Sequence, residues 1–187
     1  EEVLPPNVET HKTVFGVKDT WVEQDSKKIT KENLAKLKKV CDALDLSPIG
    51  FMVVSEAISH LIAEEEGAPL SAILADIGRK KVILSLLRGG KIVEQTEGPI
   101  EEGIKTTVDN LLKNFTASVL PARIIIYDAK NADELSQQFI GHQWSKSLPF
   151  LHVPQVTVLT SGFDAKAVAF GAAAQMGFEL LCMELPA

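Results

Sequence analysis

The sequence is poor in the residues that build disulfide frameworks and metal centres. Its 187 residues include two cysteines, Cys41 and Cys182, which lie far apart, and four histidines that are widely scattered. None of the histidines stands in a metal-ligand spacing such as His-Glu-x-x-His. We therefore predict no disulfide framework and no dedicated metal site. The low cysteine content is typical of a reducing, cytoplasmic compartment.

Excess positive charge and long apolar runs are also lacking. The formal net charge is −6, whereas a general nucleic-acid or anionic-membrane surface needs a basic field. The apolar stretch 165–178 is interrupted by Lys166 and Gln175 and is shorter than the ~20 residues of a membrane-spanning helix. The apolar content of 45% supports a substantial core. We predict a folded protein with no nucleic-acid ligand and no transmembrane segment.

The first residues, EEVLPPNVETHK, have neither the basic region nor the apolar core of a signal peptide. The pair Pro5-Pro6 is typical of a linker. We expect residues 1–12 to be a linker and the sequence to be a piece of a longer protein.

Hydrophobic periodicity after residue 69 predicts the order β-β-β-α-β-α-β-α. The expected strands are 71–76, 80–87, 91–96, 122–127 and 155–159, and the expected helices are 101–116, 131–140 and 164–176. Gly89-Gly90 is a turn signal between the second and third strands. This order predicts an α/β fold with a mixed five-stranded sheet over residues 69–180, followed by a tail, 181–187.

A shorter β-α-β-α unit is predicted before it, over residues 13–68. Its strands are expected at 13–17 and 49–54, and its helices at 30–44 and from Ser55 to Glu66. Thr30 and Ser55 are the predicted helix caps. The apolar stripe of the first helix consists of Leu34, Leu37, Val40, Cys41 and Leu44. The interval 67–69 is the expected boundary between the two units.

The motif Asp76-Ile77-Gly78 between two predicted strands resembles the second phosphate-binding hairpin of the actin-like ATPase superfamily. Over 69–180 the element order is similar to a complete ribonuclease-H-like half-domain, and 13–68 is similar to the end of a preceding half-domain. Within the superfamily, the chain most resembles bacterial actin-like proteins of cell division and type IV pilus assembly. The segments 37–62, 103–106, 123–133 and 161–174 carry this resemblance.

The resemblance implies ATP and Mg²⁺ as cofactors. The nucleotide-site residues that it implies are Asp76, Gly78, Gly103, Thr106, Asp128 and Ala129. Two departures stand out: Gly78 is followed by Arg79-Lys80-Lys81, with no phosphate-binding hydroxyl, and Asp128-Ala129 replaces a glycine pair that would let the backbone lie against the nucleotide.

We therefore predict an assembly or scaffold protein with an incomplete or vestigial nucleotide pocket, and we assign no catalytic residue. One alternative is an active Mg-ATP-binding ATPase, and another is a small-molecule kinase of the same superfamily. Asp76 has a simpler alternative role, which is to bond turn amides at a strand end.

A segment rich in large apolar residues, 139–154, is a candidate partner-binding surface. Trp144, Phe150 and Leu151 are its predicted contact residues, since exposed aromatic clusters mark interfaces. The alternative is that this segment folds back over the sheet and is buried. The resemblance implies protein partners in a membrane-associated assembly. Unpaired strand edges in the incomplete first unit also predict a possible homodimer.

Overall fold

A computed structural model describes residues 12–23, 26–127 and 132–177. Its main element is a five-stranded mixed sheet with the strand order β5-β4-β3-β6-β7. The strands are β3 (Ile73–Ile77), β4 (Lys81–Arg88), β5 (Lys91–Pro99), β6 (Arg123–Tyr127) and β7 (Gln155–Val158). Strands β3, β4 and β5 form an antiparallel meander, and β6 and β7 continue the sheet parallel to β3. The predicted α/β fold with a mixed five-stranded sheet is confirmed.

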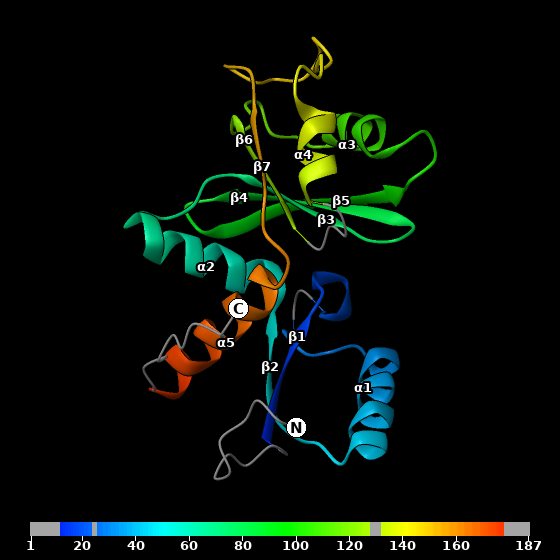
Figure 1. The fold of residues 1–187 in the computed structure, drawn as a ribbon, viewed down its shortest axis with the longest axis vertical. Helices are drawn as coiled ribbons and strands as arrows, with labels where there is room; N and C mark the ends of the chain where they lie inside the picture. Colours follow the sequence, from blue (N-terminus) through cyan, green and yellow to red (C-terminus); the bar gives the residue numbers. More distant parts are fainter. Residues whose placement is uncertain (1–11, 24–25, 128–131, 178–187) are drawn as a thin grey trace.

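Helices cover both faces of this sheet (Figure 1). Helices α3 (Ile104–Leu112) and α4 (Ala132–Phe139) lie on one face, and α2 (Val54–Glu66) and α5 (Phe163–Met176) lie on the other. Each face has its own apolar core, because successive side chains of a strand point to opposite faces. The six interior residues of β4 are therefore all buried.

Helix α3 is shorter than the predicted 101–116. It begins after Gly103, whose φ of 97° is readily adopted only by glycine. At its other end the amides of Lys113, Asn114 and Phe115 donate to carbonyls three residues earlier, so the helix tightens into a turn after Leu112. Phe115 is still buried, as its place on the apolar stripe predicted.

A second, two-stranded sheet lies beyond α2 and α5 (Figure 1). It consists of β1 (Lys12–Val17) and β2 (Ser47–Val53), which run parallel and are connected through the 3-10 turn η1 (Asp19–Trp21) and α1 (Lys31–Leu44). Thr30 caps α1 as predicted, because its side chain accepts a hydrogen bond from the amide of Asn33. The predicted β-α-β-α order is thus present.

Helix α5 packs against α2 and also against β1 and β2. Its small residues permit this close approach: a Cβ on Gly171 would lie 2.6 Å from Met52 Cε on β2. The last helix of the larger sheet therefore joins that sheet to the smaller one. Within the described residues, no helix is long and apolar enough to cross a membrane.

Candidate functional site

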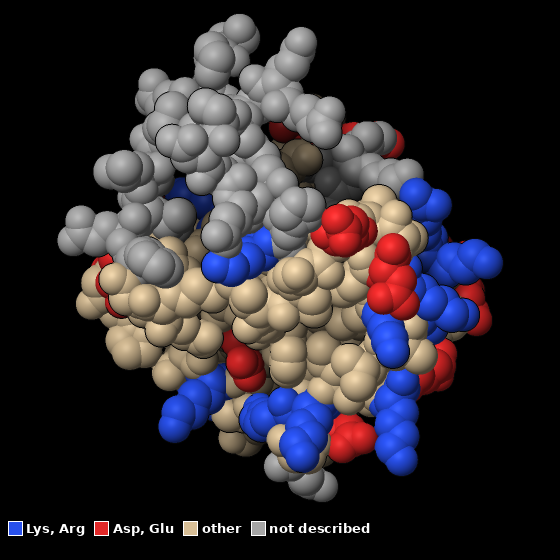
Figure 2. Space-filling model, turned by 90° about the horizontal axis from the view of Figure 1, so that it is seen from below, with Lys and Arg blue, Asp and Glu red and all other residues tan. Residues whose placement is uncertain are grey.

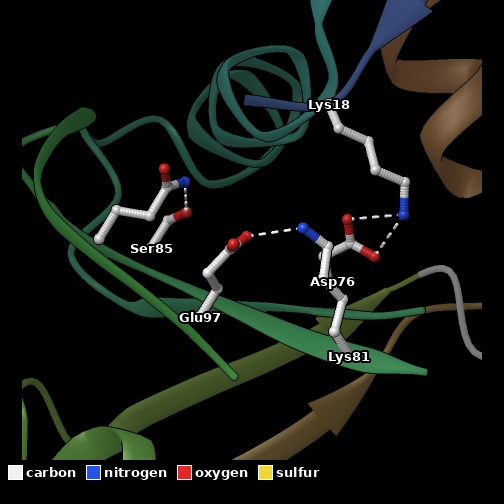
Figure 3. Close-up of polar contacts among 6 residues, drawn as sticks. Lys18, Asp76, Lys81, Ser85 and Glu97 are labelled. Atoms are coloured by element: carbon white, nitrogen blue, oxygen red, sulfur yellow. Dashed lines mark hydrogen bonds and ion pairs between the residues drawn. The ribbon is translucent and has the colours of Figure 1, made fainter. Parts of the chain in front are cut away.

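Asp76 lies at the end of β3, on the face of the main sheet that α2 covers. Its side chain is 3% exposed, and both of its carboxylate oxygens lie 2.9 Å from Lys18 Nζ. Lys18 follows β1, so this ion pair joins the smaller sheet to the larger one (Figure 3). Both oxygens of this carboxylate therefore already have a partner within the protein, and a Mg²⁺ ion or its water would have to compete with the ammonium group. Within the described residues, no group of three acidic, histidine or cysteine side chains could hold a metal ion.

Gly78 forms the corner between β3 and β4. Its amide donates to the carbonyl of Lys81 at 3.0 Å, and a Cβ at this position would lie 3.1 Å from the same oxygen. Glycine therefore fits the tight turn itself, and its N–H group is already used within the protein.

The next predicted pair, Gly103 and Thr106, lies at the start of α3. The chain reaches this point alongside the β3–β4 turn, because the amide of Ile100 donates to the carbonyl of Lys80. Thr106 is half-buried, and it is the neighbouring Thr107 whose hydroxyl donates back to the Gly103 carbonyl at 3.0 Å. Asp128 and Ala129 lie outside the described residues.

Polar side chains continue across β4 and β5 on the same face as Asp76 (Figure 3). Gln95 Nε2 donates to Ser85 Oγ at 2.8 Å, and Ser85 is only 2% exposed. Lys81 Nζ lies 2.7 Å from Glu97 Oε2 near the sheet edge. This face of the main sheet is thus apolar where α2 covers it and polar where it approaches η1.

A second acidic group, Asp19, lies next to Lys18. Its Oδ1 accepts a hydrogen bond from Ser55 Oγ at 2.6 Å. Burial raises the pKa of Asp19, although the Ser55 hydrogen bond acts in the opposite direction. Ser55 was predicted to cap α2; this prediction is wrong, because α2 begins one residue earlier, with Val53 at the N-cap position, and the Ser55 hydroxyl instead donates to Asp19.

A cavity of about 930 Å³ lies between this region and β5. Its charged lining consists of Asp19, Lys27, Glu56, Lys91 and Glu94. The volume lies within the ~300–1,000 Å³ of small-molecule sites. The predicted nucleotide residues Asp76, Gly78, Gly103 and Thr106 do not line it.

The predicted partner segment is divided between buried and exposed side chains. Trp144 and Phe150 are partly buried and pack on the core under α3 and α4, with their ring centroids 6.0 Å apart. Leu151 is 73% exposed. Only one of the three predicted contact residues is therefore fully presented at the surface.

Asp109 of α3 holds this segment in place. Its carboxylate accepts hydrogen bonds from the amide and the hydroxyl of Ser145, and Lys113 Nζ lies 3.1 Å from Oδ2. Burial opposes ionisation of Asp109, but these bonds together lower its pKa below the ordinary value. His142 Nε2 lies 3.9 Å from Oδ1, and the His142 ring contacts Trp144 edge-on.

Lys18, Asp19 and Asp109 were not identified from the sequence. Each acts through a partner that is 36 or more residues away, namely Asp76, Ser55 and Ser145. The sequence holds two local signals for these residues. Lys18-Asp19 is a polar pair directly after a predicted strand, and Asp109 lies on the apolar side of the predicted helix that became α3.

No family model matches the chain, and no curated protein sequence matches it. Several solved structures are similar, including two at low identity. The first, described as an AlfA filament bound to AMPPNP, is 14% identical with a TM-score of 0.40 and covers 72% of this chain and 48% of its own. The second, a type II variant of the Aquifex aeolicus Ppx/GppA phosphatase, is 12% identical with a TM-score of 0.32 and covers 62% of this chain and 45% of its own. The chain therefore spans about half the length of these structures.

Proposed function

We propose that this chain is an assembly module of actin-like fold whose nucleotide site is vestigial. Its role, by the resemblance of its sequence, is to bind proteins in a membrane-associated machine of the pilus-assembly or cell-division kind. The observation that carries the proposal is the Lys18–Asp76 pair. Both oxygens of the carboxylate that would act on Mg²⁺-bound water are bound by a protein ammonium group at 2.9 Å.

The β3–β4 turn supports the same conclusion. The Gly78 amide, which would approach a phosphate oxygen in an active hairpin, donates to Lys81 instead. The three residues after Gly78 are Arg79, Lys80 and Lys81, so this turn has no hydroxyl to hold a phosphate. Cationic side chains attract a phosphate, but they do not replace the metal-directed carboxylate.

The second candidate function is ATP binding at a site that does not include Asp76 and its hairpin. The cavity of about 930 Å³ favours it by its size alone, because Asp19, Glu56 and Glu94 line it beside Lys27 and Lys91. In that case the chain would bind ATP at a site displaced from the one that the resemblance implies.

Isothermal titration of Mg-ATP into the purified chain tests the two candidates. The vestigial site predicts no heat of binding and no phosphate release. Binding that is lost in the Lys27→Ala/Lys91→Ala double variant but kept in Lys18→Ala would favour the cavity. Micromolar binding with phosphate release that depends on Asp76 would overturn the proposal.

A further inference from the structure

Helix α1 leaves most of its apolar stripe uncovered. Among its 14 residues only Cys41 is buried. Leu34 is 54% exposed and Leu44 is 63% exposed. An amphipathic helix gains most of its stability by covering its apolar face. An uncovered stripe of this size indicates that a contact surface is present.

The facing surface is also apolar and open. Ile49 and Phe51 of β2 are 49% and 36% exposed, and β2 has one hydrogen-bonded neighbour among the described strands. Parallel sheets are normally covered on both faces. Between α1 and this sheet lies a groove of about 560 Å³, which we call the α1 groove. Its lining is Phe15, Ile29, Leu34, Leu37, Lys38, Cys41, Asp42, Leu46, Pro48, Ile49, Gly50 and Phe51.

The chain beside the α1 groove is strongly basic. Residues 26–39 contain six lysines and one acidic residue, in a chain whose net charge is −6. No ion pair within the described residues involves Lys28, Lys31, Lys38 or Lys39. Figure 2, seen from below, shows lysine and arginine side chains along the right-hand margin, on the side where α1 lies, with acidic side chains among them and uncharged surface beside them. The charged residues of the lining itself are Lys38 and Asp42. The groove therefore combines an apolar floor with a surrounding in which lysines outnumber acidic residues.

We propose that the α1 groove is a docking site for an acidic segment of another protein that carries large apolar side chains. Apolar side chains of the segment fill the groove, and its carboxylates face the unpaired lysines. A second copy of this chain fits less well, because a two-fold dimer brings the same patch, with its excess of lysine over acidic residues, against itself. The inference deepens the proposed assembly role by giving the surface and the chemistry of the partner.

Fluorescence anisotropy with a labelled synthetic peptide tests the proposal. The probe is a short peptide in which Glu-Glu pairs alternate with Leu-Leu pairs, and two further peptides replace Glu by Lys or Leu by Ala. We expect the Glu/Leu peptide to bind at least about tenfold more tightly than either of the others, with an affinity that falls as salt rises. Equal binding of the Glu and Lys peptides would overturn the charge argument. Equal binding of the Glu/Leu peptide and the peptide with Ala in place of Leu would overturn the argument that apolar side chains fill the groove.

Matched variants locate the site. Leu34→Glu and Ile49→Glu change exposed residues of the groove, so the fold is expected to survive, and each is expected to weaken binding about tenfold. Met176→Glu, at a site that is 43% exposed and lies outside the groove, is expected to leave binding unchanged. Lys38→Glu with Lys39→Glu is expected to reverse the preference between the Glu and Lys peptides, whereas Lys105→Glu with Lys146→Glu is not. An equal effect of the groove and control variants would overturn the assignment.

Light scattering completes the test. Self-association that Leu34→Glu abolishes, without peptide binding, would assign the groove to a second copy and overturn the proposal. Failure of peptide binding would leave the ATP titration unaffected, so the two proposals can fail separately.

Discussion

Lys18 and Asp76 form an ion pair across 58 residues of sequence, with Nζ 2.9 Å from each carboxylate oxygen. Asp76 is 3% exposed and Lys18 is 39% exposed, so the carboxylate is buried while the ammonium group still reaches solvent. The pair connects the end of β1 to the end of β3. It is also the contact on which the proposal of a vestigial nucleotide site rests.

Removal of one partner of this pair should cost much more than removal of both. Lys18→Met leaves a buried carboxylate without its counter-ion, and we expect a loss of about 2–4 kcal/mol, somewhat below the ~3–5 kcal/mol of a fully buried pair. The double variant Lys18→Met/Asp76→Leu should recover most of this loss. Urea unfolding at neutral pH measures both. Equal losses in the single and double variants would show that the pair contributes little.

Asp19→Asn should stabilise the protein at neutral pH. Burial raises the pKa of Asp19 above its ordinary value of 3.8, so the folded state bears a cost for keeping this group ionised. The gain from Asp19→Asn should be complete at pH 7, shrink as the pH falls through the raised pKa, and vanish below 3.8. Thermal unfolding over this pH range, with the exposed Asp42→Asn as control, checks the sign. A loss of stability at pH 7 would mean that the hydrogen bond from Ser55 outweighs the cost of burial.

Asp109 should have the opposite effect on stability at neutral pH. Because its pKa is lowered, its contribution is present above the ordinary value of 3.8 and is lost as the pH falls through the folded-state pKa. Asp109→Ala removes the acceptor of two Ser145 hydrogen bonds, and we expect a loss of about 2–3 kcal/mol at pH 7. Unfolding at pH 7 measures this loss. A red shift of Trp144 fluorescence in a Trp21→Phe background would show that the 139–154 segment has been released.

The aromatic residues of that segment should contribute to stability. Trp144 stacks on Phe139 with ring centroids 5.9 Å apart and packs on the core, so Trp144→Ala should cost about 2–4 kcal/mol. Leu151→Ala should change stability by less than ~0.5 kcal/mol, because the side chain is 73% exposed. If Trp144→Ala instead left the melting temperature unchanged and abolished capture of a partner, Trp144 would belong to a binding surface.

Much of the larger sheet could be predicted because its signals are local. The β-branched run 122–127 predicted the buried strand β6, and the Gly89-Gly90 turn appears with φ values of 56° and 79°. The contacts made by the residues of the candidate site were less predictable from the sequence. Asp76 and Gly78 were identified by position, but their partners Lys18 and Lys81 were not, and Gly78 serves a turn where a phosphate contact was expected.

The sequence alone determined the order of helices and strands, since hydrophobic period, turn residues and the Thr30 cap depend on neighbours a few residues away. Only the tertiary structure decided that Ser55 bonds Asp19, that Lys18 neutralises Asp76 and that α1 leaves its apolar stripe open. Each of these outcomes depends on how two distant elements approach each other. Residue pattern specifies which face of an element is apolar, but the packing of the whole chain determines what that face meets.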